Sequence, residues 1–572
     1  MCAQTVAPPS QQAETLDPFT AEIIRNTLVA IGDEMFVSLG RTSKSPIIYE
    51  VLDYCCGLTD ARAQLIAQGN GVALFLGTLT FAVQEVLAKF GLEGMQEGDI
   101  FVTNDPYTGG GTHLSDVSMV MPIFFEGQLI AFAANKAHWT EVGGKDPGSW
   151  TTDSTEVFQE GLQLPNVKLF AQGQPIQSVI DIVEANVRLP DMTLGDLFAQ
   201  AASVRLGARR VAELCRKYGR PTVEAAIERL LAYGEEIVRG EMARLPKGVF
   251  EAEDWIDDDG LSTEPIPVKV KVTITGDEFI CDFTGTGPQA RGPINCSWTS
   301  VYSGLRAIFR AITEPRMPPN EGCFRPIRAI CPEGTVFTAR RPAPVSTYWD
   351  TMLFVTELVW KALAPHLPDH LSAAHFLSVC ADVTATIHPD SGELALLVEP
   401  NAGGWGASEG QDGADGLVCV GDGETYILPV EVTETVYGIL VDQYAYHITE
   451  GGEGKYRGGR GLVRDYRMLS ETGGTFTGTF GRHKFPVWGV HGGRAGSRNV
   501  VEVLHADGRP VARFGKCARY PLQKDDVVRL ITATGGGWGD PAERAREQVE
   551  ADLRAGMITP EIAEKYYGYT GG

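Results

Sequence analysis

The sequence predicts a mixed α/β protein of the α+β class, with several domains in which glycine-rich loops surround β-hairpins and long helices. Its 572 residues exceed what a single hydrophobic core usually organises. Apolar residues recur at helical spacing over 194–218 and 223–242, whereas 267–274 alternates polar and apolar residues as a half-buried strand does. The 66 glycines exceed average usage and cluster near polar and charged residues, as in loops around a buried site.

Helices are predicted wherever apolar residues repeat every three to four positions. Asp17 stands before Pro18, which places an N-cap acid ahead of a proline at the first helical position, so a helix begins there and runs to about Leu39. Gly91 ends the next apolar run. Further helices are expected over 73–90, 178–187, 194–218, 223–242, 300–312, 351–363 and 542–554.

The pattern changes from helical to alternating near Lys247, which predicts a domain boundary. A β-meander follows over 250–283, and a proline-rich stretch over 315–344 leads into a last third of strands and glycine loops. Four regions are therefore expected: a disordered leader over 1–16, an N-terminal α/β domain over 17–247 that carries a metal site, a β-rich middle domain over 248–345, and a C-terminal α+β domain over 346–572.

Composition narrows the class of partner. With 49 basic and 73 acidic residues the formal net charge is −24, which argues against binding to nucleic acid or anionic membranes. No run of about 18 uncharged apolar residues occurs, so no membrane span is expected. The N-terminus lacks the pattern of a secretory signal, and the eleven cysteines form no C-x-x-C pair. We therefore expect a cytoplasmic protein with reduced thiols.

A hairpin over 117–137 carries the residues of a candidate metal site. Two apolar, β-rich runs flank the turn signal Glu126-Gly127, and a two-residue turn there gives cross-strand partners whose numbers sum to 253. Asp116 then lies opposite Ala137, which is one residue from His138. His113 stands three positions before Asp116. Two imidazoles and a carboxylate at that spacing suit a divalent cation with an open coordination position. Histidines hydrogen-bonded to backbone are the alternative, and spacing alone favours neither.

Asp53 is a further candidate ligand, since carboxylates in an otherwise apolar segment are costly unless they are paired or bound to metal. A satisfied buried acid is the alternative there.

No P-loop and no G-x-S-x-G elbow occurs. Gly452 to Arg457 resembles an anion-binding loop but is more typical of a structural turn. A cysteine nucleophile at Cys296 or Cys323 stays open, although no neighbouring residue marks a lowered thiol pKa.

Several segments together resemble the hydantoinase B/oxoprolinase family. The most specific are Asn104-Asp105-Pro106-Tyr107, Gly110 to Asp116, Ala137-His138 and Val142-Gly143-Gly144. Supporting segments are Gly292 to Cys296, Pro319 to Gly322, Lys455 to Gly459 and Gly535 to Pro541, so the resemblance extends over nearly the whole chain. Trp139, Glu141 and Thr449-Glu450-Gly451 depart from the family's commonest pattern, which leaves the substrate open.

The resemblance implies an enzyme with two kinds of subunit. His113, Asp116 and His138 match the family's metal ligands and Asp53 matches an upstream acid, for a divalent metal such as zinc or manganese. The partner implied is a hydantoinase A-type ATPase that binds ATP and magnesium, in an α2β2-type hetero-oligomer. The activity implied is ATP-dependent hydrolysis of a hydantoin, a lactam or 5-oxoproline, with a ketone carboxylase subunit or a non-catalytic scaffold as alternatives. Glu141 and Asp105 are candidate bases or orienting groups, with a structural role as the alternative.

Overall fold

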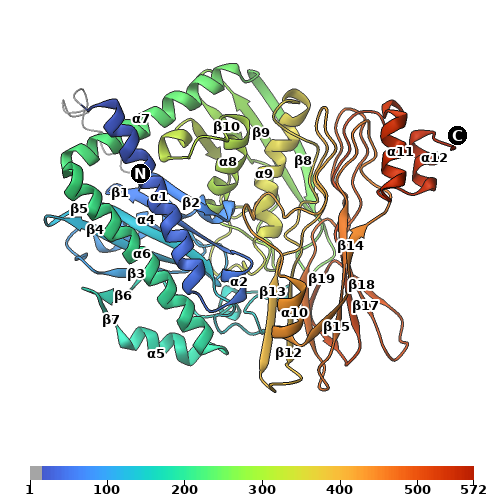
Figure 1. Ribbon diagram of the computed structural model, residues 1–572, viewed down its shortest axis with the longest axis horizontal. Helices are drawn as coiled ribbons and strands as arrows, with labels where there is room; N and C mark the ends of the chain where they lie inside the picture. The colour runs from blue at the N-terminus through green and yellow to red at the C-terminus, as the bar shows by residue number, and fades with distance from the viewer. Residues whose placement is uncertain (1–15, 572) are drawn as a thin grey trace.

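A seven-stranded antiparallel sheet forms the N-terminal part of the chain, in the order β2-β1-β5-β4-β3-β6-β7 (Figure 1). The computed structural model describes residues 16–571. The strands of this sheet are β1 (Tyr54–Asp60), β2 (Leu65–Gly71), β3 (Ile100–Thr103), β4 (Asp116–Phe125), β5 (Gln128–His138), β6 (Val167–Ala171) and β7 (Gln174–Pro175). β1, β4 and β5 are buried along most of their length because helices cover both faces of the sheet.

Two long helices cover one face of this sheet, and two shorter ones cover the other. α1 (Pro18–Thr42) and α6 (Pro190–Tyr218) pack together, with α1 on β1 and β2 and α6 on β4 and β5, and α7 (Arg220–Arg244) packs against both helices. Asp17 caps α1 as predicted, since its carboxylate accepts the amide hydrogen of Thr20 at 2.9 Å. The opposite face holds α3 (Ala73–Leu76) and α4 (Leu79–Phe90). α5 (Gln177–Asn186) packs on α6, and α2 (Pro46–Tyr49) contacts α1 and β5.

The predicted single helix over 73–90 is wrong, because it is broken between α3 and α4. A Cβ on Gly77 would lie 2.7 Å from the Cα of Ser303, so α8 packs directly on the break. Within residues 16–571 this stretch is the one that is long and apolar enough to cross a membrane by length and composition. Over half of it is buried inside the protein, as is common for a core helix.

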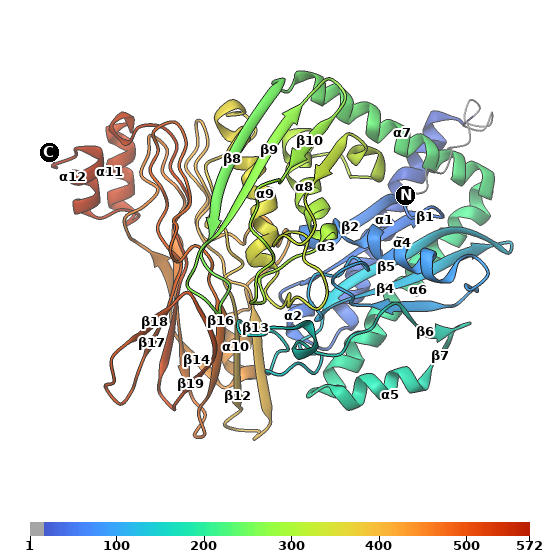
Figure 2. The same cartoon turned by 180° about the vertical axis from the view of Figure 1, so that it is seen from behind.

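The middle of the chain forms a four-stranded sheet in the order β11-β10-β9-β8, as the alternating pattern predicted. Its elements are β8 (Gly248–Ile256), β9 (Ile266–Ile274), β10 (Phe279–Asp282) and β11 (Ile327–Ile330), with α8 (Trp298–Ile312) and α9 (Trp349–Leu363) on one face. Figure 2 shows the strands in front of these two helices. α9 packs on β8 and β9, so this helix lies with the middle sheet although it follows the boundary predicted at 345.

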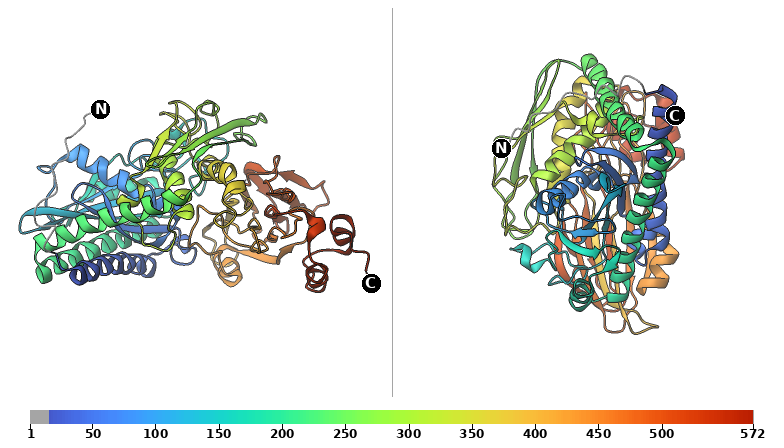
Figure 3. Two further views of the ribbon diagram at one scale, coloured as in Figure 1. Left: turned by 90° about the horizontal axis from the view of Figure 1, so that it is seen from above. Right: turned by 90° about the vertical axis from the view of Figure 1, so that its left-hand side faces the viewer.

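Two antiparallel sheets make up the last third, at the opposite end of the long axis from the N-terminal sheet (Figure 3). One contains β13 (Leu394–Glu399), β12 (Ala381–Ile387), β16 (Gly474–Thr479) and β19 (Lys516–Leu522). The other contains β14 (Ile439–His447), β15 (Gly461–Met468), β20 (Val527–Ile531), β17 (Val500–Leu504) and β18 (Ala512–Phe514). α10 (Val430–Tyr437) packs on β13 and β14, and α11 (Arg546–Arg554) and α12 (Pro560–Tyr567) end the chain.

Many of the glycines pack extended loops of this last third directly on one another, a region we call the glycine layer (402–416, 451–461, 489–496 and 533–539). The amide of Gly459 donates to the carbonyl of Trp405 at 2.8 Å, and that of Gly535 donates to Gly459 at 3.0 Å. A Cβ on Gly459 would lie 1.9 Å from the carbonyl oxygen of Ala414, so only glycine fits. Arg457 pairs with Asp415 and Asp552, which favours a structural role for the basic loop.

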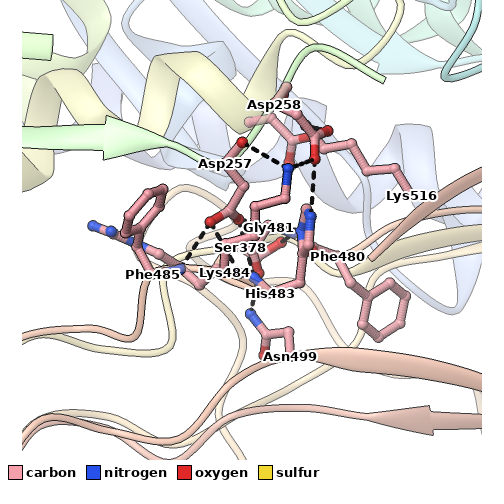
Figure 4. Close-up of polar contacts among 12 residues, drawn as sticks. Asp257, Asp258, Ser378, Phe480, Gly481, His483, Lys484, Phe485, Asn499 and Lys516 are labelled. Carbon is pink, nitrogen blue, oxygen red and sulfur yellow. Dashed lines mark hydrogen bonds and ion pairs between the residues drawn. The ribbon is translucent and has the colours of Figure 1, made fainter. Parts of the chain in front are cut away.

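A buried group of charged side chains, the ionic seam (Asp257, Asp258, His483, Lys484 and Lys516), joins the middle sheet to the C-terminal sheets (Figure 4). The ring nitrogens of His483 lie 3.2 Å from a carboxylate oxygen of Asp257 and 3.0 Å from one of Asp258. Lys484 reaches the same Asp258 oxygen at 2.7 Å. Burial alone would lower the pKa of His483, but these two carboxylates raise it to about 9. The seam is thus a network of satisfied charges.

Candidate metal centre

The hairpin β4–β5 places His113, Asp116 and His138 at its open end. The predicted register is wrong by one residue, because Asp116 lies directly opposite His138 and not Ala137. Phe125 pairs with Gln128 next to the turn as predicted, but β5 has one extra residue, Ile130, at a bulge between the Ile123 and Phe124 pairs. The bulge shifts every pair beyond it. It therefore brings the carboxylate and the imidazole closer together than the turn alone would.

One nitrogen from each histidine and one oxygen from Asp116 lie within 4.8 Å of one another. Nε2 of His113 is 3.1 Å from Oδ1 of Asp116, and the two imidazole rings are 5.0 Å apart between centroids. All three residues are at most 5% exposed. The amide of His138 donates to the carbonyl of Asp53 at 3.0 Å, and Thr112 donates its hydroxyl to Asp116 Oδ2, so both groups are held in place.

Two of the atoms in this group have no hydrogen-bond partner in the part of the chain that the structure describes. They are Oδ1 of Asp116, whose contact with Nε2 of His113 at 3.1 Å lacks the geometry of a hydrogen bond, and Nδ1 of His138, and both are buried. Leaving a buried polar atom unsatisfied costs about 1–3 kcal/mol, more for a charged group. Two imidazoles and a carboxylate with free lone pairs are the donor set that a zinc or manganese ion takes. These residues therefore fit a divalent cation.

The electrostatics of the group agree with this chemistry. Burial, together with the neighbouring His113, lowers the pKa of His138 to about 3, so its ring is neutral and able to ligate at physiological pH. Burial raises the pKa of Asp116, but attraction by His113, His138 and Lys136 outweighs it, and the pKa falls below its ordinary value. The group thus combines a neutral imidazole with an ionised carboxylate.

Asp53 also lies at this site, on the loop between α2 and β1. Its carboxyl group lines the same cavity as the histidines, but the compact group of ligand atoms does not include it. Burial, with Asp116 and Asp422 nearby, raises the pKa of Asp53 well above its ordinary value. A role as fourth ligand therefore stays a prediction.

The cavity beside the three residues has a volume of about 50 Å³, which is room for a few water-sized groups. Tyr348 and Trp349 close one side, with ring centroids 5.4 and 5.3 Å from that of His113. Glu399 and Asp422 reach the cavity from the C-terminal third. No pattern around these four residues marked them in the sequence, because only the packing of the regions against each other brings them to the hairpin.

Glu141 and Asp105 do not line this cavity. Glu141 is fully buried and accepts hydrogen bonds from the guanidinium and the amide of Arg188, both at 2.5 Å, and from Ser149 at 3.3 Å. Asp105 caps the amide of Tyr107 at 2.9 Å and lies 3.3 Å from Arg341. Both carboxylates hold loops together here, which is the structural alternative considered for them.

The cysteines considered as nucleophiles are also placed away from the site. Cys296 and Cys323 are buried and line other parts of the core. Burial raises the pKa of both thiols, which opposes formation of the reactive thiolate.

Comparison with known proteins agrees with the resemblance seen in the sequence. The family model described as hydantoinase B/oxoprolinase matches residues 17–541. The chain is 30% identical to the B-type subunit of a putative D-/L-hydantoinase from a Pseudomonas species, over 97% of this chain and 95% of the relative. The crystal structure of the ATP-dependent caprolactamase from Pseudomonas jessenii superposes with a TM-score of 0.91 at 28% identity, covering 98% of this chain and 97% of that one.

An acetone carboxylase structure without nucleotide has a similar fold. Its TM-score is 0.90, covering 98% of this chain and 80% of that chain, at 18% sequence identity. At that identity the likeness concerns the fold alone.

Proposed function

The chain belongs to the hydantoinase B/oxoprolinase family, and on this basis we propose that it is the B-type component of an ATP-dependent enzyme that opens a small cyclic amide by hydrolysis. The observation that carries the proposal is the pair of unsatisfied buried atoms, Asp116 Oδ1 and His138 Nδ1, beside His113 in a small cavity. Two relatives, named as the B-type component of a hydantoinase and the beta component of a caprolactamase, support the reaction class.

His113, Asp116 and His138 would hold a divalent metal, with Asp53 as the proposed fourth ligand. Such an ion supplies Lewis acidity that activates water or polarises a carbonyl oxygen. The chain's own groups prepare that chemistry: the Asp53 carbonyl orients the backbone of His138, and Thr112 orients Asp116. Tyr348 and Trp349 pack against His113 and keep bulk water away from it.

ATP chemistry belongs to a second chain in this proposal. The sequence has no P-loop, and the names of these two relatives describe one component of a multi-subunit enzyme. We propose an A-type ATPase as partner, which phosphorylates the amide oxygen and thereby turns a poor electrophile into an activated one. An α2β2-type assembly is the arrangement proposed.

A ketone carboxylase subunit is the second candidate, because the acetone carboxylase structure has the same fold. In that reaction ATP activates a ketone, and a bicarbonate-derived carbon is added. Relatives at 28–30% identity include a hydantoinase component, a caprolactamase and a 5-oxoprolinase, which favours hydrolysis of a cyclic amide.

The test is co-expression with a candidate A-type ATPase, co-purification, and metal analysis of the complex. ADP release is then followed with hydantoin, caprolactam, 2-pyrrolidinone, 5-oxoproline and acetone, each with and without bicarbonate. We expect a bound divalent metal and lactam- or hydantoin-dependent ADP release that needs no bicarbonate. Turnover that requires bicarbonate and a ketone supports the carboxylase. A complex without metal or turnover contradicts both.

A further inference from the structure

The cavity at the hairpin is lined by acids and apolar side chains but by no lysine or arginine of residues 16–571. Its charged lining residues are Asp53, Asp116, Glu399 and Asp422. The rest of the wall is largely aliphatic or aromatic, as with Ile47, Val72, Leu74, Phe75 and Val398. A ligand that carries a carboxylate would therefore meet acidic groups and hydrocarbon, with the histidines and any bound metal as its only positive partners.

Two buried cations close to lining residues of the cavity are already engaged in hydrogen bonds. Lys136 lies behind the wall, where its ammonium donates to Thr78 Oγ1 at 2.6 Å and to the Gly110 carbonyl at 2.5 Å. Arg464 donates to Glu399 at 2.8 Å and to the carbonyl of Leu428 at 3.3 Å. Neither lines the cavity. Turning one of them toward a ligand would break buried charge-assisted hydrogen bonds, which costs several kcal/mol.

Asp422 reaches the cavity on a loop that is fixed to the N-terminal part of the chain. The amide of Leu74 donates to the carbonyl of Gly421 at 3.1 Å, and that of Tyr426 donates to Val51 at 2.9 Å. A Cβ on Gly423, whose φ is +62°, would lie 2.6 Å from the carbonyl of Gly71. The backbone thus holds Asp422 in place from both sides.

The Asp422 carboxylate has spare hydrogen-bonding capacity. Its side-chain partner is the thiol of Cys419, at 3.2 Å from Oδ2, and a thiol is a weak donor. The residue lines the cavity, and 8% of its surface is exposed. Burial raises the pKa of this carboxyl group to about 7. At pH 8 it is therefore mainly ionised, accepts a hydrogen bond from an N–H group in the cavity and repels an anion.

We propose that this site selects small cyclic amides without a carboxylate, and that Asp422 is the specificity residue that accepts the ring N–H and disfavours anionic rings. This rests on the proposed hydrolysis of cyclic amides. Among relatives, a 5-oxoprolinase of Arabidopsis thaliana is 27% identical, and the substrate that its name implies carries a carboxylate. Sequence identity does not separate the two substrate types, since a caprolactamase structure matches at 28%, so the proposal rests on the lining of the cavity.

The test compares two substrates of one ring size, 2-pyrrolidinone and 5-oxoproline, which differ by the carboxylate alone. Both are assayed at pH 8 with the metal-loaded complex and ATP, and their binding is measured in parallel by ligand-observed NMR. We expect at least about 30-fold higher kcat/KM for 2-pyrrolidinone, about 2 kcal/mol, and stronger binding of that ring. Equal or better binding of 5-oxoproline overturns the inference, and so does no binding of either ring.

Asp422→Asn, which keeps the shape and removes the charge, is expected to reduce the preference about tenfold, mainly by admitting 5-oxoproline. Glu251→Gln, on the solvent-exposed face of β8, is the matched control and leaves the ratio unchanged. An unchanged ratio in Asp422→Asn overturns the role of this residue. If Asp422→Asn does not fold, the comparison of the two substrates on the unaltered complex still tests whether the site selects uncharged rings. Selective NMR binding without any turnover would contradict the proposed hydrolysis while leaving the selection of uncharged rings intact.

Discussion

The hairpin pocket (His113, Asp116, His138 and the cavity beside them) and the ionic seam both place histidines among aspartates. They differ in whether the ring nitrogens of the histidines have partners. In the seam both ring nitrogens of His483 have carboxylate partners, and its pKa rises to about 9. In the pocket Nδ1 of His138 has none, and its pKa falls to about 3. Buried polar groups are nearly always paired. This difference is expected if the satisfied cluster stabilises the fold and the unsatisfied one holds the proposed metal.

Removing a seam carboxylate should have the largest effect, and it should be on stability. Asp258→Ala leaves His483, Lys484 and Lys516 without a shared partner, and breaking a buried pair in this way costs about 3–5 kcal/mol. Urea unfolding measures the loss. Glu253→Ala, which breaks an exposed pair with Lys269, is the control and should change stability by less than about 1 kcal/mol. If Asp258→Ala also changes stability by less than about 1 kcal/mol, the ionic seam stabilises the fold no more than an exposed ion pair does.

Removing a pocket histidine should instead affect metal content and turnover. His138→Ala is expected to lose most of its bound metal and at least about 100-fold in activity, about 2.7 kcal/mol of barrier. Elemental analysis and ADP release measure the two together. His370→Ala removes an exposed histidine and serves as the control. A variant that keeps both metal and activity contradicts the ligand assignment.

The two histidines should also give opposite pH dependence. The folded pKa of His483 lies above the unfolded value of about 6.5, so its contribution is complete below that pH and is lost as pH rises through about 9. The stability difference between wild type and His483→Gln should fall by about 2.5 kcal/mol from pH 7 to 10. His138, with a folded pKa below 6.5, destabilises the metal-free chain as pH falls instead. A difference that does not change with pH would show that His483 is not protonated in the seam.

The smallest effect on turnover should come from Asp105 and Glu141, the two acids that lie outside both regions. Asp105→Asn keeps the shape of the cap on Tyr107 and weakens a partly exposed pair with Arg341, so turnover should change less than about threefold. Glu141→Gln, which leaves the Arg188 guanidinium short of a buried carboxylate, should lower the unfolding midpoint and not kcat. A large loss of kcat in either variant, with the fold intact, would support the catalytic role predicted for that residue.

Much of this could be predicted from local sequence, because it depends on neighbours along the chain. The N-cap at Asp17, the two long helices α6 and α7, the meander from β8 to β10 and the pairing of β4 with β5 follow from periodicity and turn signals. The three candidate ligands come from one hairpin for the same reason. The family membership rests on the same stretches.

Long-range packing decided the rest. The bulge at Ile130 set the register of the hairpin, and α8 packing on Gly77 divided the helix predicted over 73–90. The glycine layer fits only glycine because carbonyls from distant loops occupy the space of a Cβ, and spacing in the sequence does not carry that information.

The sequence by itself determined the class of fold, the acidic charge and the hairpin that brings two histidines and an aspartate together. Only the tertiary structure decided that Asp116 Oδ1 and His138 Nδ1 face the cavity without a hydrogen-bond partner among residues 16–571, and that Glu141 is held by Arg188. It also decided that Asp422 enters the cavity from more than 280 residues further along the chain. The physical reason is that periodicity fixes which face a side chain takes, whereas the partner it meets there depends on how separate layers pack.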